Sequence, residues 1–277
     1  MPTPLIITLS VLCGLLILAF AAFLILIAPG KRGDIDRFKN VKFAHRGLHN
    51  AERAENSMSA FSAAVEAGFG IELDVRLSSD GELVVFHDDT LTRVAKIEGR
   101  VDAFTADELA RVSLSGTGEG VPRFADVLAM VGGRVPLLVE IKEDAGKYAV
   151  SDATAEIMRD YKGPYIIESF NPLSLGNIKK KLPNATRGFL SQCFLADPVY
   201  RKPLYFALQC LLTNRLSSPA FIAYNHEHAN SFALRVIRRL FGAVTYAWTV
   251  RSPEEENQAY RYGFDSVIFE NYIPEKN

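Results

Sequence analysis

The chain has 277 residues, 48% of them hydrophobic, and a formal net charge of −1 at pH 7. The length fits one large domain or two small ones. A near-neutral charge without a cluster of Lys and Arg argues against nucleic acid as a partner. Cys13, Cys193 and Cys210 are too few and too scattered for a disulfide framework or a zinc site. We expect free thiols, with a single disulfide between Cys193 and Cys210 as the alternative.

The first 30 residues predict a membrane anchor. Residues 5–28 include no charged side chain, and a helix of that length spans ~36 Å, enough to cross a bilayer. A secretory signal peptide is the alternative, but no Lys or Arg precedes the apolar run. Lipid attachment at Cys13 is disfavoured because the apolar run continues beyond it. We therefore predict a retained anchor over residues 1–30 and a short polar linker over residues 31–40.

From residue 41 onward, short β-rich runs alternate with helical stretches, which is typical of βα units around a parallel sheet. The predicted strands are 42–44, 70–75, 136–141, 165–168, 186–189, 220–223, 244–248 and 266–269. The predicted helices are 57–67, 123–131, 149–159, 173–180, 230–241 and 253–262, with Asn56 and Ser57 as candidate caps for the first. This order predicts an α/β fold, a (β/α)₈ TIM barrel over residues 41–277, with its active site at the carboxyl ends of the strands.

Two stretches interrupt the alternation. Residues 90–121 are polar and punctuated by glycine, and we predict a small insertion after the second strand, over the barrel mouth, with one short helix near 106–111. Residues 194–218 contain an apolar run from Leu204 to Leu212, which is too short to span a membrane. That run is either a buried helix or an exposed apolar surface near a bilayer.

Carboxylates alternate with aliphatic residues in two predicted strands. Glu72 and Asp74 share one face of the second strand, and Glu140 stands among aliphatic residues in the third. An ionised carboxylate inside a barrel is costly unless it is paired or binds a cation. If Glu140 were the single inward acid, an ion pair with Lys142 would be a sufficient explanation for it. Three inward carboxylates favour an oxygen-ligated cation, Mg²⁺ or Ca²⁺.

A predicted hairpin brings a histidine back beside these carboxylates. Asp80 and Gly81 are typical of a two-residue turn, which would bring His87 opposite Asp74. A slip of one residue would place His87 opposite Glu72 or between the two carboxylates. In each register the histidine lies beside the acidic face.

His45 is the second candidate, because it ends the first predicted strand. Two histidines that flank a metal suit phosphodiester cleavage: one takes a proton from the attacking hydroxyl, and the other gives a proton to the leaving oxygen. Arg46 and Lys142 would offset phosphate charge, Arg with its planar fork and Lys as a point charge.

The chain resembles the glycerophosphodiester phosphodiesterase family over residues 42–271. The motifs that carry the resemblance are His45-Arg46-Gly47, Glu55-Asn56-Ser57, Glu72-Leu73-Asp74-Val75, Asp80-Gly81, Val84-Val85-Phe86-His87-Asp88, Glu140-Ile141-Lys142, Ser169-Phe170, Ala247-Trp248-Thr249-Val250 and Gly263-Phe264-Asp265-Ser266-Val267. The resemblance implies a (β/α)₈ barrel, a divalent metal, and hydrolysis of glycerophosphodiesters to sn-glycerol 3-phosphate and an alcohol. It implies metal ligation by Glu72, Asp74 and Glu140, acid/base roles for His45 and His87, phosphate binding by Arg46 and Lys142, and support of the site by Glu55.

The sequence departs from the family pattern in two places. Ala54 stands where Pro usually precedes the Glu-Asn pair, and Phe269-Glu270 stand where the closing strand usually ends in Thr-Asp. Neither change touches a proposed ligand, although the shape of the glycerol pocket can differ. Trp248 is expected to wall that pocket, with a place in the core as the alternative.

The remaining histidines are expected to be bystanders. His226 and His228 lie far in sequence from the carboxylates, so we predict a solvated loop rather than a metal pair, and His49 is also assigned to a loop.

Two competing functions follow from the anchor and the apolar run. One is cleavage of lysophospholipid or a lipid-linked glycerophosphate polymer on the same barrel. The other is a non-catalytic membrane-bound binding module, which the complete set of histidines and carboxylates disfavours.

The orientation in the cell membrane follows from basic residues near the apolar run. Loops on the cytoplasmic side of a membrane helix carry excess Lys and Arg. None precedes residue 5, whereas Lys31, Arg32, Arg37, Lys39 and Lys42 follow residue 28. The bias predicts a single-pass protein whose catalytic domain is cytoplasmic. The reverse orientation is the alternative, because glycerophosphodiesters and lipid-linked polymers also occur outside cells.

Overall fold

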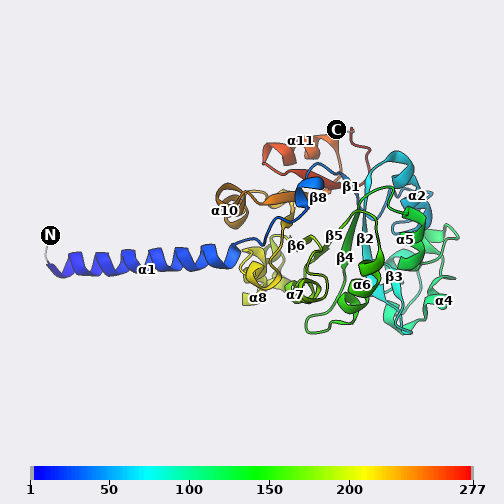
Figure 1. The fold of residues 1–277 in the computed structure, drawn as a ribbon, viewed down its shortest axis with the longest axis horizontal. Coiled ribbons are helices and arrows are strands. Elements are labelled where there is room, and N and C mark those ends of the chain that lie inside the picture. Colours follow the sequence, from blue (N-terminus) through cyan, green and yellow to red (C-terminus); the bar gives the residue numbers. More distant parts are fainter. Residues whose placement is uncertain (1–2, 276–277) are drawn as a thin grey trace.

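Eight parallel strands close into a barrel in this computed structural model, which describes residues 3–275 (Figure 1). Around the barrel the strands follow the order β1 (Phe43–Ala44), β2 (Gly70–Leu77), β4 (Leu137–Ile141), β5 (Tyr165–Ser169), β6 (Arg187–Ser191), β7 (Phe221–Asn225), β8 (Val244–Val250) and β9 (Ser266–Phe269). β9 pairs with β1 and closes the ring. The predicted (β/α)₈ barrel is confirmed.

The outer helices cover the barrel where the sequence predicted them. They are α2 (Met58–Ala67), α5 (Phe124–Val131), α6 (Ala149–Asp160), α7 (Pro172–Lys181), α10 (Phe232–Phe241) and α11 (Pro253–Arg261). Ser57 caps α2 by accepting from the Ala60 backbone N–H, and Gly68 ends it in the left-handed conformation. Strand residues that face these helices, such as Val139, join the main apolar core.

The amino end of the barrel is closed by the segment that was predicted to be a polar linker. A short 3₁₀ helix, η1 (Ile35–Arg37), and Phe38 lie there, and both Ile35 and Phe38 are buried in the cluster that fills this end of the barrel. Tyr246 donates a hydrogen bond to the Phe38 carbonyl oxygen at 2.5 Å. The segment therefore packs as part of the barrel instead of hanging free.

The insertion lies between β3 (Leu83–Val85), which pairs antiparallel to β2, and α5. It carries α3 (Thr92–Ala95), η2 (Val101–Ala103), α4 (Ala106–Leu109) and η3 (Leu114–Gly116), around a small apolar cluster of its own with Val84 and Phe86. The insertion thus packs beside β3 and reaches the rim of the mouth through Arg93, which contacts Glu55 and Asp88. The predicted helix near 106–111 is present but shorter.

The segment 194–218 forms η4 (Phe194–Ala196), η5 (Pro198–Tyr200), α8 (Pro203–Gln209) and α9 (Asn214–Ser217). The apolar run has two faces, one buried and one exposed. Leu208 and Leu211 are buried, whereas Leu204 is 58% and Phe206 51% exposed. The cysteines in and near the segment, Cys193 and Cys210, are free thiols.

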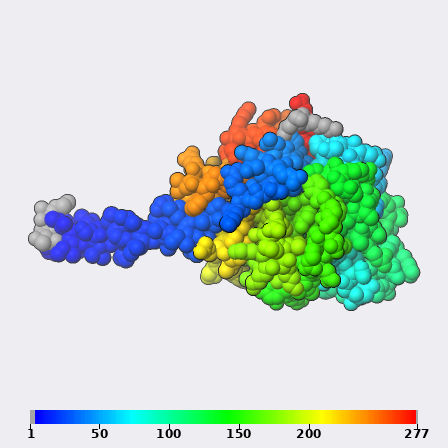
Figure 2. All heavy atoms as spheres, viewed as in Figure 1, coloured from blue at the N-terminus to red at the C-terminus, as the bar shows by residue number. Residues whose placement is uncertain are grey.

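An apolar helix, α1 (Thr3–Ile27), projects from the barrel (Figures 1 and 2). Its residues Pro4–Ile27 are long and apolar enough to cross a membrane, a test that a signal sequence also passes. The end of α1 is docked: Ile27 is fully buried, and Asn214 of α9 donates to its carbonyl oxygen at 2.8 Å.

Candidate active site

Three carboxylates predicted as metal ligands lie together inside the barrel mouth. Glu72 and Asp74 come from β2 and Glu140 from β4, where Asp74 and Glu140 are register partners. One oxygen from each of the three lies within 4.8 Å of the others, and all three side chains are buried. An all-oxygen set of this kind suits a hard divalent cation.

Neighbouring donors hold these carboxylates in place. The Arg46 backbone N–H donates to Glu72 Oε2 at 2.9 Å, and Asn56 Nδ2 donates to Asp74 Oδ2 at 2.8 Å. Arg46 and Asn56 both have a left-handed backbone, with φ of 55° and 54°, and Asn56 N–H donates to the Arg46 carbonyl oxygen. Strained non-glycine residues of this sort concentrate at functional sites.

Lys142 lies between two of the carboxylates, 2.7 Å from Glu140 Oε1 and 3.2 Å from Asp74 Oδ1. Burial raises the pKa of Asp74, but Lys142, His87, Arg46 and the Asn56 hydrogen bond outweigh it and hold that pKa below its usual range. Burial and the charges of Asp74 and Glu140 raise the pKa of Glu72 well above its usual value.

Glu140 shows the same repulsion. Burial is the main cause that raises its pKa to about 7, against the lowering effect of Lys142. One lysine therefore does not neutralise the cluster, and ionising all three carboxylates requires further positive charge. The residues present fit a bound divalent cation on this ground as well as by the chemistry of their oxygens.

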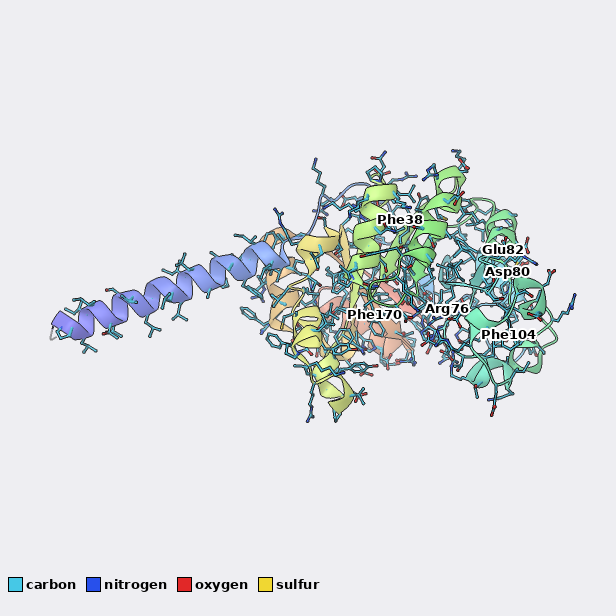
Figure 3. The ribbon with its side chains drawn as sticks, turned by 90° about the horizontal axis from the view of Figure 1, so that it is seen from below. Phe38, Arg76, Asp80, Glu82, Phe104 and Phe170 are labelled. Atoms are coloured by element: carbon cyan, nitrogen blue, oxygen red, sulfur yellow. The ribbon has the colours of Figure 1, made fainter. Side chains whose placement is uncertain are left out.

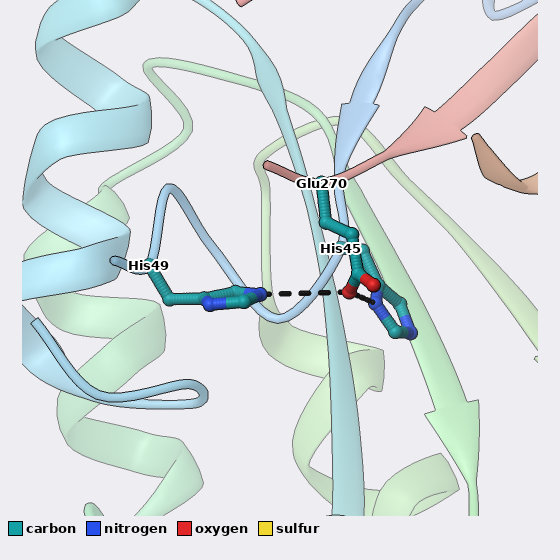
Figure 4. Close-up of side chains that lie close together, drawn as sticks. All are labelled: His45, His49 and Glu270. Carbon is teal, nitrogen blue, oxygen red and sulfur yellow. Dashed lines mark hydrogen bonds and ion pairs between the residues drawn. The ribbon is translucent and has the colours of Figure 1, made fainter. Parts of the chain in front are cut away.

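His45 follows β1 and is held by a carboxylate that the sequence analysis did not assign. Its Nδ1 lies 2.6 Å from Glu270 Oε2, just after β9 (Figure 4). Burial lowers the pKa of His45 to about 4, although Glu270 acts to raise it. Burial raises the pKa of Glu270, but hydrogen bonds from the histidines hold it well below its usual value. A neutral imidazole thus donates from Nδ1 to an ionised Glu270, and Nε2 is left as a proton acceptor.

His87 is held in a similar way by Asp88, whose Oδ1 lies 2.6 Å from its Nδ1. Burial lowers the pKa of His87, while the charge of Asp74 acts to raise it. The hairpin has the one-residue slip that the sequence allowed, in place of the two-residue turn. Val75 pairs with Val85 across a three-residue loop over 79–81, and the continuation of this register sets His87 between the two carboxylates of β2 instead of opposite Asp74.

Glu55 lies beside the site and binds two arginines. Its Oε1 accepts from Arg46 Nη1 at 2.7 Å and from Arg93 Nη2 at 2.6 Å. Arg93 also binds Asp88, the partner of His87. A chain of ion pairs therefore links the loop after β1 to the loop after β3, and the guanidinium of Arg46 also lies 3.5 Å from Asp74.

Trp248 lies at the end of β8 and packs edge-on against Phe170, with ring centroids 5.5 Å apart. Lys142 Nζ lies 5.9 Å from the centre of the Phe170 ring. Phe170, Lys142 and Glu140 line a cavity of about 440 Å³ whose far wall is the apolar face of α8, with Leu204 and Leu208. Figure 3 shows Phe170 and Arg76 at this mouth, with α8 (yellow) on the side toward α1.

Glu168 was also missed by the sequence analysis. It lies on β5 as the register partner of Glu140 and is 1% exposed. Burial, with the charges of Glu140 and Glu72, raises its pKa well above the usual value. The signal was present: an acid in an aliphatic strand is the pattern that identified Glu72 and Glu140.

The other histidines divide into two cases. His49 is in a loop as predicted, but its Nε2 lies 3.6 Å from Glu270, and it forms a second possible cation group with His45. The prediction of a solvated loop was wrong for His226, which is 8% exposed with its Nε2 3.2 Å from the Thr249 carbonyl oxygen. Neither His226 nor His228 belongs to a possible metal group among residues 3–275.

The fold and this site together define a (β/α)₈-barrel enzyme. Its mouth combines a buried carboxylate cluster with two carboxylate-bound histidines, and cationic side chains stand beside them. These groups are suited to proton transfer around a phosphate ester.

Comparison with known proteins gives the family. The model of the glycerophosphoryl diester phosphodiesterase family matches residues 45–273. A glycerophosphodiester phosphodiesterase of Caldanaerobacter subterraneus subsp. tengcongensis is 31% identical, over 83% of this chain and 93% of that protein. The chain therefore belongs to the glycerophosphoryl diester phosphodiesterase family, and it is an enzyme.

Solved structures agree with the fold. The glycerophosphodiester phosphodiesterase of Thermotoga maritima superposes with a TM-score of 0.65 at 28% identity, covering 83% of this chain and 94% of that one. A phosphodiesterase of Oleispira antarctica, solved with the product sn-glycerol 3-phosphate, has a TM-score of 0.70 at 21% identity, covering 84% and 94%. At 21% identity, the similarity to the Oleispira protein shows a shared fold and no more.

Proposed function

We propose that this chain hydrolyses glycerophosphodiesters to sn-glycerol 3-phosphate and an alcohol, with one divalent cation, Mg²⁺ or Ca²⁺, held by Glu72, Asp74 and Glu140. The observation that carries the proposal is the buried carboxylate cluster with oxygens within 4.8 Å of one another. Membership of the family supplies the reaction class. The product bound to the Oleispira protein is consistent with the same substrate class.

In the proposed mechanism, a bound cation would polarise a phosphoryl oxygen and offset negative charge. His45 takes a proton from the attacking hydroxyl at Nε2, because its Nδ1 is occupied by Glu270. His87 gives a proton to the leaving oxygen, and Asp88 stabilises its charged form. Arg46 and Lys142 bind phosphate oxygens, and Trp248 walls the glycerol pocket.

The full-length chain in detergent, offered a panel of glycerophosphodiesters, tests this proposal. We expect release of sn-glycerol 3-phosphate that stops in excess chelator and returns with Mg²⁺ or Ca²⁺. Comparison of the two ions at equal concentration decides which one supports turnover. Release of the phosphorylated alcohol in place of sn-glycerol 3-phosphate would contradict the proposed bond cleavage.

A second substrate, lysophospholipid, is favoured by the cavity that joins Lys142 to the apolar side of α8. A single acyl chain would lie against Leu204 and Leu208. Leu204→Asp should raise KM for lysophosphatidylcholine by about tenfold, the effect of ~1.4 kcal/mol of lost apolar contact, and leave KM for glycerophosphocholine unchanged. Val199→Asp, at a residue 71% exposed on η5, is the matched control. Equal effects on both substrates would remove the acyl chain from this cavity.

We further propose a single-pass membrane anchor over residues 1–30, the packed segment 31–40, and a catalytic domain over 41–277 in the cytoplasm. The docking of Ile27 onto Asn214 supports a retained α1. The exposed Leu204 and Phe206 support contact of α8 with the bilayer. Lys162→Cys, with the native cysteines replaced by Ser, should react with an impermeant maleimide only after cells are permeabilised. Labelling in intact cells would place the domain outside.

A further inference from the structure

A second cavity, of about 950 Å³, lies where α1 joins the barrel. It is lined by the segment that follows α1, the loop after α7, the first residue of β6, and the turn between α9 and β7. In Figure 2 the segment after α1 (blue) lies against the barrel between the orange α10 region and the yellow α8–α9 region. This cavity adjoins the amino ends of β6 and β7, away from the carboxylate cluster at the mouth.

Specific backbone and side-chain contacts hold the junction between α1 and the barrel, beside the cavity. Gly30 N–H donates to the Pro219 carbonyl oxygen at 2.7 Å, and a Cβ at Gly30 would lie 2.1 Å from the Ser218 carbonyl oxygen. Only glycine fits this close approach. Together with the Asn214–Ile27 hydrogen bond, these contacts fix the wall of the cavity relative to α1.

The lining is strongly cationic. Lys31, Lys179, Arg187 and Arg215 line it, and Asp34 is its single acidic residue. Asp34 is already engaged, with Arg37 Nη1 3.2 Å from its carboxylate. Lys179 Nζ donates to the Ser218 hydroxyl at 2.7 Å, which keeps its charge at the wall.

Arg187 is the most informative of the four. Its side chain is 9% exposed, and Nη1 donates to backbone carbonyl oxygens, at 2.6 Å to Ala185. Its Nε has no hydrogen-bond partner, and no carboxylate among residues 3–275 forms an ion pair with it. Burial lowers the pKa of Arg187. A buried guanidinium without a carboxylate is costly unless an anion occupies the cavity beside it.

The position of the cavity indicates where that anion comes from. Pro4–Ile27 spans ~36 Å as a helix, against a hydrocarbon core of about 30 Å, so the next residues lie at the level of lipid headgroups. Ala28 and Pro29, the first residues after α1, line the cavity. Basic pockets at this level bind anionic headgroups.

We propose that this cavity binds the phosphate headgroup of an anionic phospholipid from the leaflet into which α1 runs. The inference rests on the proposed membrane anchor and is independent of the catalytic reaction. The bound headgroup neutralises Arg187 and its neighbours and holds the barrel at a fixed angle to the membrane, with α8 on the bilayer side of the mouth.

The test is a lipid titration of the full-length chain in detergent micelles, followed by native mass spectrometry. Phosphatidylglycerol should bind at least tenfold more tightly than phosphatidylcholine, since four cations face the headgroup. The double variant Lys31→Gln/Arg215→Gln, at exposed positions, should lose about 30-fold in affinity for phosphatidylglycerol. Arg187→Gln should lose affinity as well, with its folding checked by unchanged hydrolysis of glycerophosphocholine.

The matched control is Lys180→Gln/Arg239→Gln, which removes two cations from α7 and α10 outside the cavity lining. It should keep the wild-type affinity. Equal binding of the two lipids, or equal losses in the control and the cavity variants, would overturn the site. Displacement of phosphatidylglycerol by low-millimolar inorganic phosphate at constant ionic strength would assign the cavity to free phosphate and overturn the lipid source. A chain washed from membranes by alkaline carbonate would refute the anchor itself.

Discussion

The two ends of this barrel are built on opposite principles. At the amino end, Phe38, Phe43, Phe221 and Tyr246 form an apolar cluster, and the polar groups there have partners, as in the Tyr246 hydrogen bond to Phe38. At the carboxyl end, four buried acids face one another across β2, β4 and β5, with a single lysine between two of them. One end stabilises the fold, and the other gathers like charges at a cost.

The charged groups at the two ends show which end is less stable because of its functional side chains. Lys42 and Glu256, paired at 2.8 Å near the amino end, satisfy each other. Glu72 and Glu168 near the mouth have raised pKa values because burial and neighbouring carboxylates disfavour their charged forms. Lys142 and Arg46 offset only part of this charge. The remaining repulsion costs stability, and a bound divalent cation would offset it.

The sharpest way to break this comparison is to remove a carboxylate. Glu72→Ala or Glu140→Ala should abolish turnover, and excess chelator should do the same to the wild type. Glu66→Gln, at an exposed position on α2, is the control and should leave the rate unchanged. Full activity in excess chelator would show that the cluster serves no cation.

Glu72→Gln sharpens the same point through stability. The raised pKa of Glu72 means that the metal-free folded protein binds a proton more tightly than the unfolded chain. Stability is therefore lost as pH rises from about 4.5 toward the raised folded pKa. The variant should melt higher than the metal-free wild type at pH 7, with a smaller difference at pH 4.5, and added Mg²⁺ should no longer raise its Tm. A lower Tm than the wild type at pH 7 would contradict the repulsion.

The histidines give the next largest effect. His45→Ala and His87→Ala should each lower kcat by about 10²–10⁴, the usual contribution of a positioned acid or base. Circular dichroism and Mg²⁺-dependent melting should stay close to the wild type. A His87→Ala variant that retains most of the rate would remove His87 from the mechanism.

The amino end should respond in the opposite way. Phe38→Ala should lower the free energy of unfolding by about 3–5 kcal/mol, because a buried aromatic ring is lost, with kcat nearly unchanged. Phe206→Ala, which removes a ring that is 51% exposed, is the matched control and should cost less than about 1 kcal/mol. A Phe38→Ala variant that lost activity without losing stability would contradict the assignment of stability to the amino end and of activity to the carboxyl end.

Much of this arrangement was predictable because strand periodicity is local. Glu72 and Asp74 two positions apart in an aliphatic run were sufficient to place both on the barrel's inner face, and the order of the strands brought Glu140 beside them. The barrel itself followed from the alternation of strands and helices. These inferences depend on spacing along the chain, which the sequence displays directly.

What was missed depends on contacts between distant segments or on single turns. Glu270 binds a histidine 225 positions away, and nothing near it in sequence indicates that contact. The loop over 79–81 has one residue more than the predicted turn, so the register of His87 shifted by one. The polar composition of residues 31–40 predicts a linker, and it does not reveal the two buried residues, Ile35 and Phe38, that close the barrel.

The smallest expected effect concerns Glu270, which orients His45 from the neighbouring strand end. Its Oε2 holds His45 Nδ1, and its Oε1 accepts from Arg251 Nε at 2.7 Å. Glu270→Gln should lower kcat by about 10–100-fold, the usual cost of losing a carboxylate that fixes a functional histidine, with little change in KM. Glu270→Asp keeps the charge and should recover part of the rate.

The pH profile separates this positioning role from a merely structural one. Glu270 acts to raise the pKa of His45 against the effect of burial, so its loss should move the acid limb of kcat/KM to lower pH. Arg251→Gln removes the arginine partner of Glu270, leaves the carboxylate on His45, and should keep the limb near its wild-type position. If Glu270→Gln and the wild type had the same rate and the same acid limb, His45 would not depend on this carboxylate, and the departure from the family's Thr-Asp ending would carry no catalytic consequence.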